Sequence, residues 1–74
     1  MKLNEMKAGT KGRVLTVTGN SAFQRRITAV GITPGSSFEV IRCDKCSPML
    51  IYVRNTMLAI NTNDCKEIET EVLA

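Results

Sequence analysis

The fold is decided by one stretch of the chain, Ser21-Ala22-Phe23-Gln24-Arg25-Arg26-Ile27-Thr28-Ala29-Val30-Gly31-Ile32-Thr33-Pro34-Gly35. Ser21 and Gln24 have the spacing of a capping box, in which two side chains satisfy N–H groups at the start of a helix. Phe23, Ile27 and Val30 recur at helical spacing and share one face. Gly31 supplies the left-handed residue that ends a helix. The stretch therefore predicts a helix near residues 22–30, followed by a type II turn with Pro34-Gly35 at its centre.

Short β-branched and apolar runs flank this helix on both sides and predict strands. They lie at Arg13–Thr18, Phe38–Arg42, Met49–Arg54, Met57–Ile60 and Glu67–Val72. We expect the second and third runs to pair as a hairpin, and a two-residue turn at Asn55-Thr56 to return the chain beside the third. The last run alternates, which places Ile68, Thr70 and Val72 on a buried face and its glutamates in water.

Two short segments complete the chain. Leu3 and Met6 are expected to face inward from one helical turn that Asn4 caps. Residues 61–65 indicate a turn or a short 3₁₀ segment, in which Cys65 suits a small core position. Short strands, one short helix and tight turns close most economically into a small barrel, which also removes exposed sheet edges. The sequence thus predicts an all-β fold with one short helix, in which residues 1–74 form one domain.

Length and composition exclude large enzymes and membrane-spanning proteins. The 74 residues carry Lys+Arg 10 against Asp+Glu 7 and no histidine, with a net charge of +3 and 43% apolar residues. A chain this short has one core and few apolar side chains to spare for a ligand pocket. No run approaches the ~20 apolar residues of a membrane-spanning helix, and the start lacks the apolar stretch of a signal peptide. The 3 cysteines are an odd number, which favours a reducing compartment, so we expect a cytoplasmic protein without membrane insertion.

A set of spaced residues runs through nearly the whole chain. It comprises Leu3, Met6, Gly9, Gly12, Arg25-Arg26-Ile27, Gly31-Ile32, Pro34-Gly35, Pro48 and Leu58-Ala59-Ile60. This pattern, from Leu3 to Val72, resembles the FeoA family of small bacterial proteins associated with ferrous-iron uptake. The resemblance implies an SH3-like β-barrel of about five strands. It also implies a partner, the FeoB permease, which bears a cytoplasmic GTPase domain. The chain departs from the family at Cys43–Cys46, Asn55-Thr56 and Cys65, without disturbing the framework.

We therefore expect a cytoplasmic accessory or regulatory protein that binds the GTPase-bearing part of a FeoB permease and needs no cofactor. No enzymatic activity is expected, because histidine is absent and the carboxylates fall in turns or on solvent faces.

Two other functions fit the chain. One is a stand-alone module related to the C-terminal SH3-like domain of iron-dependent repressors, which would need another chain to contact DNA. The other is a small RNA- or ribosome-binding barrel, which would need a denser basic stripe and stacking aromatics, so no nucleic-acid partner is expected. The sequence leaves self-association open.

Four residues are candidates for the surface that binds the partner. Arg25 and Arg26 are adjacent on the helix and project about 100° apart, so at least one faces solvent, where a guanidinium suits a partner's carboxylates. A solvated helix face is the simpler explanation for either arginine alone. The strand Met49–Val53 is apolar on both faces, so Leu50 and Tyr52 are expected to face outward. The alternative is that the N-terminal turn or the helix covers them.

Cys43 and Cys46 have the spacing that lets two thiolates reach one tetrahedral zinc ion. This is half of a zinc site, and Cys65 does not supply the rest because it fits the core better. We interpret the pair as loop thiols without metal, with intermolecular metal or disulfide bridging as the alternative. The fold is predicted to need no metal.

Overall fold

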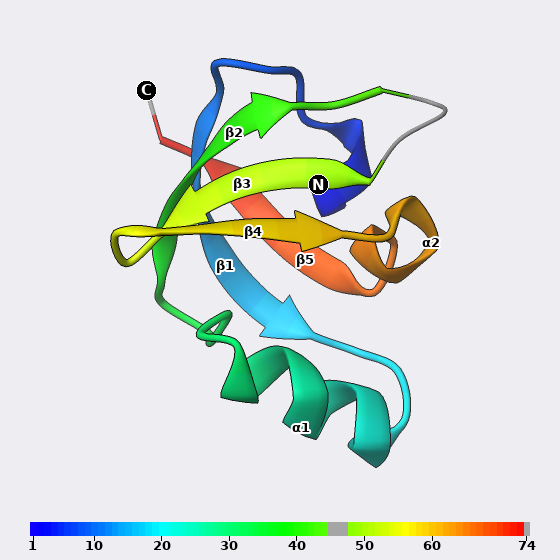
Figure 1. The fold of residues 1–74 in the computed structure, drawn as a ribbon. Helices are drawn as coiled ribbons and strands as arrows, with labels where there is room; N and C mark the ends of the chain where they lie inside the picture. Colours follow the sequence, from blue (N-terminus) through cyan, green and yellow to red (C-terminus); the bar gives the residue numbers. More distant parts are fainter. Residues whose placement is uncertain (45–47, 74) are drawn as a thin grey trace.

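A five-stranded antiparallel sheet forms the body of the protein (Figure 1). The structure, a computed structural model, describes residues 1–44 and 48–73. Its elements in chain order are η1 (Leu3–Glu5), β1 (Lys11–Val17), α1 (Ser21–Ala29), β2 (Ser37–Arg42), β3 (Met49–Val53), β4 (Thr56–Ile60), α2 (Thr62–Cys65) and β5 (Ile68–Val72). The predicted mostly-β fold with one short helix is confirmed, and β2 and β3 pair as expected. No helix in the described part of the chain has the length and apolar character needed to cross a membrane.

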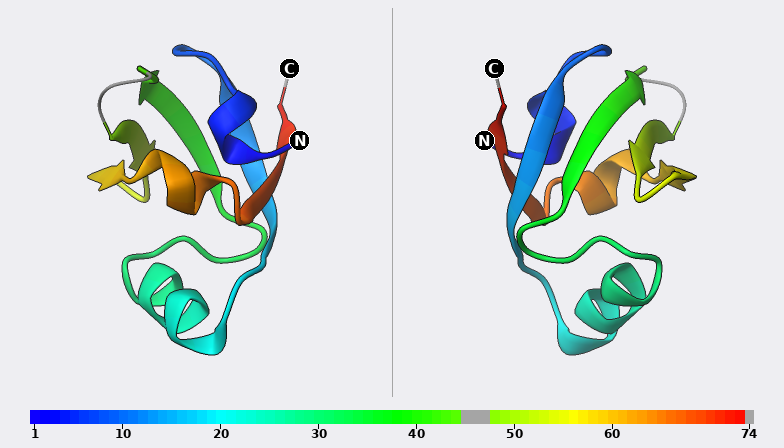
Figure 2. Two further views of the ribbon diagram at one scale, coloured as in Figure 1. Left: turned by 90° about the vertical axis from the view of Figure 1, so that its right-hand side faces the viewer. Right: turned by 90° about the vertical axis from the view of Figure 1, so that its left-hand side faces the viewer.

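The strands lie in the order β4-β3-β2-β1-β5, and the sheet curves around its inner face. Both views in Figure 2 show α1 at one end of the molecule, away from the strands. η1 packs against both α2 and β5. Since β4 and β5 are the terminal strands, α2 connects the two edges of the sheet along the chain.

The inner face of the sheet meets side chains from η1, α1 and α2 in a hydrophobic core. The largest fully buried side chains are Leu3, Ile32, Met49, Ile51, Ile68, Val14, Val40, Thr70 and Cys65. Thr70 is satisfied there because its hydroxyl donates to the carbonyl of Met1 at 2.8 Å. The predicted burial of Val72 is wrong, since its side chain is 53% exposed. Val72 is the last residue of β5 and pairs with Gly12.

The start of α1 lies one residue away from the predicted cap. Asn20 is the cap, and its Oδ1 accepts from the backbone N–H of Phe23 at 2.8 Å. Gln24 does reach back, but its Nε2 donates to the carbonyl of Gly19 at 3.0 Å instead of accepting from a cap N–H. Asn and Ser are nearly equal as capping residues, so their order in the sequence could not identify which one caps.

The end of α1 is the predicted one. Gly31 lies at φ +105°, and its N–H donates to the carbonyl of Thr28 at 3.0 Å. The next N–H, of Ile32, donates to the carbonyl of Ile27 at 3.2 Å, which completes a Schellman motif. The type II turn follows, with Gly35 at φ +91°.

Replacing Gly31 by valine should lower the free energy of unfolding by more than ~1 kcal/mol, because a β-branched side chain is strained at positive φ. Apart from the adjoining residues, no atom in the described part of the chain lies within 4 Å of the position that a Cβ would take, so the penalty comes from the backbone conformation and not from crowding by other parts of the fold. Urea unfolding measures the difference. Ala29→Val, at an exposed helical position, should cost no more than about 0.7 kcal/mol. Equal losses in the two variants would contradict this account of the helix end.

The turn between β3 and β4 lies one residue earlier than predicted. Arg54 and Asn55 have φ values of 52° and 62°, and Val53 pairs with Thr56 across the turn. Positive φ at both central residues defines a type I′ turn, which favours asparagine but seldom contains arginine. The central residues of the turn are therefore Arg54 and Asn55, not the predicted Asn55 and Thr56, and β4 begins at Thr56.

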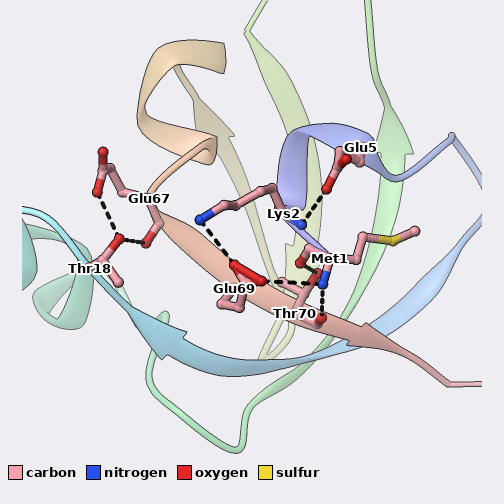
Figure 3. A network of polar contacts seen from close by, with 7 residues as sticks. All are labelled: Met1, Lys2, Glu5, Thr18, Glu67, Glu69 and Thr70. Carbon is pink, nitrogen blue, oxygen red and sulfur yellow. Dashed lines mark hydrogen bonds and ion pairs between the residues drawn. The ribbon is translucent and has the colours of Figure 1, made fainter.

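The chain start pairs with the outer edge of β5 (Figure 3). Thr70 donates its backbone N–H to the carbonyl of Met1 at 2.7 Å, and Lys2 bridges to Glu69. The Lys2 ammonium lies 3.2 Å from the Glu69 carboxylate and, as its hydrogen-bond donor, lowers the pKa of that carboxyl. The backbone N–H of Lys2 also donates to Glu5 at 2.7 Å, so Lys2 and not Asn4 stands at the cap of η1.

Candidate partner-binding surface

The outer face of β3 carries Leu50 and Tyr52, as predicted from a strand that is apolar on both sides. Its inward side chains, Met49, Ile51 and Val53, are all buried. Tyr52 is 41% exposed, whereas Leu50 is half-buried. The two residues lie two positions apart on one strand and so share one face.

β4 adds a third apolar side chain to this face. Met57 lies opposite Tyr52 in the β3–β4 ladder and is 52% exposed. We call Leu50, Tyr52 and Met57 the outer strand patch. The Tyr52 hydroxyl donates to Oδ1 of Asn55 at 3.2 Å, which ties the ring to the turn. The sequence reasoning missed Met57 because it placed the turn one residue late; a type I′ turn at Arg54-Asn55 would have set Met57 opposite Tyr52.

A shallow hollow of about 350 Å³ adjoins the outer strand patch. It is lined by Lys11, Ser37, Phe38, Glu39, Tyr52, Arg54, Asn55 and Leu73. Neither Lys11 nor Arg54 forms an ion pair with any residue of the described ranges. An aromatic ring beside unpaired cations suits a partner with carboxylates near an apolar contact.

The two arginines of α1 differ in their surroundings. The Arg26 guanidinium lies 3.3 Å from the Asp64 carboxylate and 5.4 Å from the centre of the Phe23 ring. It therefore connects α1 to α2. Arg25 is exposed and makes no ion pair within residues 1–44 and 48–73. In Figure 1, α1 lies on the β4 side of the sheet, and Arg26 lines a hollow of about 220 Å³ together with Leu58, Ala59 and Ile60 of β4. Arg25 is not among the residues that line this hollow.

The cysteines lie in different environments. Cys65 is fully buried, with its Sγ 3.7 Å from Sδ of Met49, which confirms the expected core position. Cys43 is half-buried and packs against the core, and Cys46 lies outside the described residues. Burial, with smaller contributions from Cys43 and Asp64, raises the pKa of the Cys65 thiol to about 12. No three of the described cysteines and carboxylates cluster as metal ligands would.

Alkaline pH should destabilise the wild-type protein partly through Cys65. Because the pKa of its thiol is raised from 9.0 to about 12 in the fold, its contribution to stability is complete below 9.0 and is lost as pH rises toward 12. Cys65→Ala should therefore flatten the fall of the unfolding free energy over this range, measured by urea titration at several pH values. Cys43→Ala removes only one of the smaller contributions and should flatten the fall much less, and identical slopes in wild type and Cys65→Ala would disprove the expectation.

Comparison with known proteins agrees with this architecture. The family model described as the FeoA domain matches residues 1–72. A Fe(2+) transport protein A/Fe(2+) transporter FeoB fusion protein of Porphyromonas gingivalis is 24% identical over 75 aligned positions, which cover 100% of this chain and 9% of the relative. The chain thus corresponds to less than a tenth of that relative's length.

Solved structures of FeoA proteins are similar to this chain. A FeoA protein from Chlorobium tepidum is 29% identical, with a TM-score of 0.91 over 100% of this chain and 71% of the other. A FeoA of Stenotrophomonas maltophilia, described as a prokaryotic SH3 domain protein, has a TM-score of 0.82 at 24% identity over 96% of this chain and 89% of the other. The predicted SH3-like fold is thereby confirmed.

A manganese-dependent transcriptional repressor shares the fold at 14% identity and a TM-score of 0.91, with coverage of 99% of this chain and 36% of the repressor. This likeness concerns the fold alone. The family match, by contrast, spans residues 1–72 of the 74. The chain belongs to the FeoA family.

Proposed function

We propose that this chain is a cytoplasmic accessory protein of ferrous-iron uptake that binds the cytoplasmic, GTPase-bearing part of a FeoB permease and assembles or modulates it. One observation carries the proposal: in the Porphyromonas gingivalis relative, a FeoA and a FeoB are parts of one fusion protein. Fusion holds two domains at a high effective concentration. A FeoA that is separate from its permease needs a binding surface of sufficient affinity to keep the same association.

The outer strand patch supports such a surface. Tyr52 and Met57 are among the large apolar side chains that the described chain exposes, and they lie opposite each other on neighbouring strands. Aromatic residues and methionine are enriched at the centres of protein interfaces, where tyrosine often dominates the affinity. Lys11 and Arg54 beside the patch supply the charged rim.

Arg25 offers a second, electrostatic contribution. It is exposed on α1 without an ion pair among the described residues, and the chain as a whole carries +3. Rim charges of this kind steer association with an acidic partner and are screened by salt. Arg26, whose guanidinium already faces Asp64, contributes less to the partner and more to the packing of α1.

In the proposed function the chain catalyses no reaction itself. Its effect on the permease would come from differential binding to the states of the permease, because a ligand shifts an equilibrium only by as much as its affinity for the two states differs. Neither a cofactor nor a nucleic acid takes part in this function.

Affinity capture from native membranes under reducing conditions tests the proposal. The immobilised chain should retain FeoB from solubilised membranes, identified by mass spectrometry. Tyr52→Asp should abolish retention, whereas Val72→Asp should not, since Val72 is 53% exposed on β5 and lies outside the patch. Retention of a repressor or of ribosomes in place of FeoB would contradict the proposal.

A further inference from the structure

A row of side chains crosses four strands on the outer face of the sheet. Residues that lie opposite each other on neighbouring strands share a face. Lys11 on β1 is paired with Glu39 on β2, and Glu39 is paired with Tyr52 on β3. Tyr52 is paired in turn with Met57 on β4, and none of the four side chains is buried. A partner that lies across the sheet can therefore contact all four at once.

The two ends of this row differ in character. At the β4 end, Met57 and Tyr52 belong to the outer strand patch and present apolar surface. At the β1 end, Lys11 lines the hollow of about 350 Å³, to which Arg54 and Tyr52 also contribute. Tyr52 thus lies at the boundary between an apolar surface and a charged one.

The charged residues of the hollow are two cations and one carboxylate. They are Lys11, Arg54 and Glu39. None of the three forms an ion pair with a residue in the ranges 1–44 and 48–73. Arg54 lies in the type I′ turn at φ 52°, where the hairpin fixes its backbone. The hollow therefore carries an excess of positive charge, which only Glu39 opposes.

Carboxylate oxygens would satisfy the donors that line the hollow. The Arg54 guanidinium and the Lys11 ammonium carry donors only, and the exposed Ser37 hydroxyl adds another. The Asn55 amide has two more, since the Tyr52 hydroxyl occupies its Oδ1 and not its nitrogen. A ligand without negative charge would remove both cations from water and give them no partner, which is unfavourable.

We propose that the segment of FeoB that docks on this face is acidic: it lays an apolar side chain on the outer strand patch and places a carboxylate in the hollow between Lys11 and Arg54. The acidic character of the segment rests on the proposed function, because FeoB is the occupant in both. Charge complementarity supports this occupant, since the apolar and cationic surfaces adjoin at Tyr52. Glu39 repels such a segment and keeps its affinity below that which the two cations alone would give.

Binding kinetics with the purified cytoplasmic part of FeoB at low salt provide the first test. The double variant Lys11→Glu with Arg54→Asn should weaken binding by about tenfold or more. Asparagine is favoured at positive φ, so the turn is retained. Lys66→Glu makes the same charge change as Lys11→Glu at an exposed position outside the lining of the hollow, and it should bind nearly as wild type does.

Glu39→Gln gives an expected gain, which loss of folding cannot imitate. Removal of the opposing carboxylate should tighten binding by about threefold, and the gain should shrink as salt is raised. If FeoB binds the wild-type chain and neither Glu39→Gln nor the double variant changes its affinity, the acidic segment is refuted while the proposed function stands.

A second measurement tests the hollow without FeoB. The probe is a capped peptide of leucine followed by two glutamates, and its control has glutamines in place of the glutamates. At millimolar concentration the acidic peptide should shift the amide signals of Lys11, Ser37 and Asn55, and the control should leave them in place. Absence of FeoB binding to the wild-type chain would contradict the proposed function. Equal shifts with both peptides, or none, would overturn the assignment of the hollow to a carboxylate.

Discussion

Replacing Gly12 by valine is expected to lower the free energy of unfolding by more than about 3 kcal/mol. Gly12 is buried in β1, between its partners Phe38 on β2 and Val72 on β5. A Cβ there would lie 2.8 Å from Cε of Met6, 2.8 Å from Cζ of Phe38 and 2.9 Å from the carbonyl oxygen of Glu71. The methionine methyl can move, but the ring and the backbone carbonyl cannot do so without shifting β2 or β5. Valine adds two further methyl groups to this crowded position.

Such a loss is large for a domain of this size, whose total stability should be roughly 4–11 kcal/mol at ~0.05–0.15 kcal/mol per residue. At about 4–8 °C per kcal/mol, the thermal midpoint should fall by more than about 12 °C. Lys11→Val introduces the same side chain at an exposed position of the same strand and should change the midpoint little. Comparable midpoints for the two variants would show that the close approach at Gly12 does not exist.

Tyr52→Ala is expected to weaken binding to the cytoplasmic part of FeoB by about 30-fold or more, which corresponds to about 2 kcal/mol. The change should appear mainly in the dissociation rate, because loss of a buried anchor shortens the lifetime of a complex. Arg25→Glu should instead slow association, and the effect should shrink as salt is raised. Surface-based kinetics at two salt concentrations separates these two contributions.

Matched variants make the comparison specific. Val72→Ala removes an apolar side chain from β5 that is more exposed than Tyr52, and its kinetics should equal those of wild type. Arg26→Glu should affect stability more than binding, since it replaces the attraction between α1 and Asp64 by repulsion. If Tyr52→Ala and Val72→Ala bind equally well, the outer strand patch is ordinary solvent-exposed surface.

The parts of the fold that the sequence predicts well depend on residues with strong local requirements. Gly31 and Gly35 adopt positive φ values that few other residues tolerate, so the end of α1 and the following turn could be predicted at the correct residues. The inward face of the last strand also follows from alternation, as Ile68 and Thr70 show.

Other features depend on small differences that the sequence does not resolve. Asn20 and Ser21 are comparable caps, and the choice between them depends on the backbone that leaves β1. The position of the β3–β4 turn was mispredicted because arginine is rare at the first central position of a type I′ turn, where glycine or asparagine is expected. Val72 is exposed at the last position of β5, and the alternation that predicted its burial does not show where the covered part of the strand ends.

In the candidate surface, too, the sequence identifies some residues and only the fold identifies others. Tyr52 was identifiable because its strand is apolar on both faces. Met57 was missed because its place opposite Tyr52 depends on the turn register. The ion pair of Arg26 with Asp64 joins residues 38 positions apart, and only the docking of α1 beside α2 brings them together. Local pattern therefore identifies candidate side chains, while the fold determines which of them remain free for a partner.

Titration of the isotope-labelled chain with the purified cytoplasmic part of FeoB, followed by amide chemical shifts, tests the central claim most directly. The account predicts saturable binding with the largest shifts at Leu50, Tyr52 and Met57, smaller shifts near Arg25, and no shifts along the core-facing residues of β5. An unperturbed spectrum at saturating concentrations of that domain, with both proteins folded, would contradict the claim that this FeoA binds the permease directly.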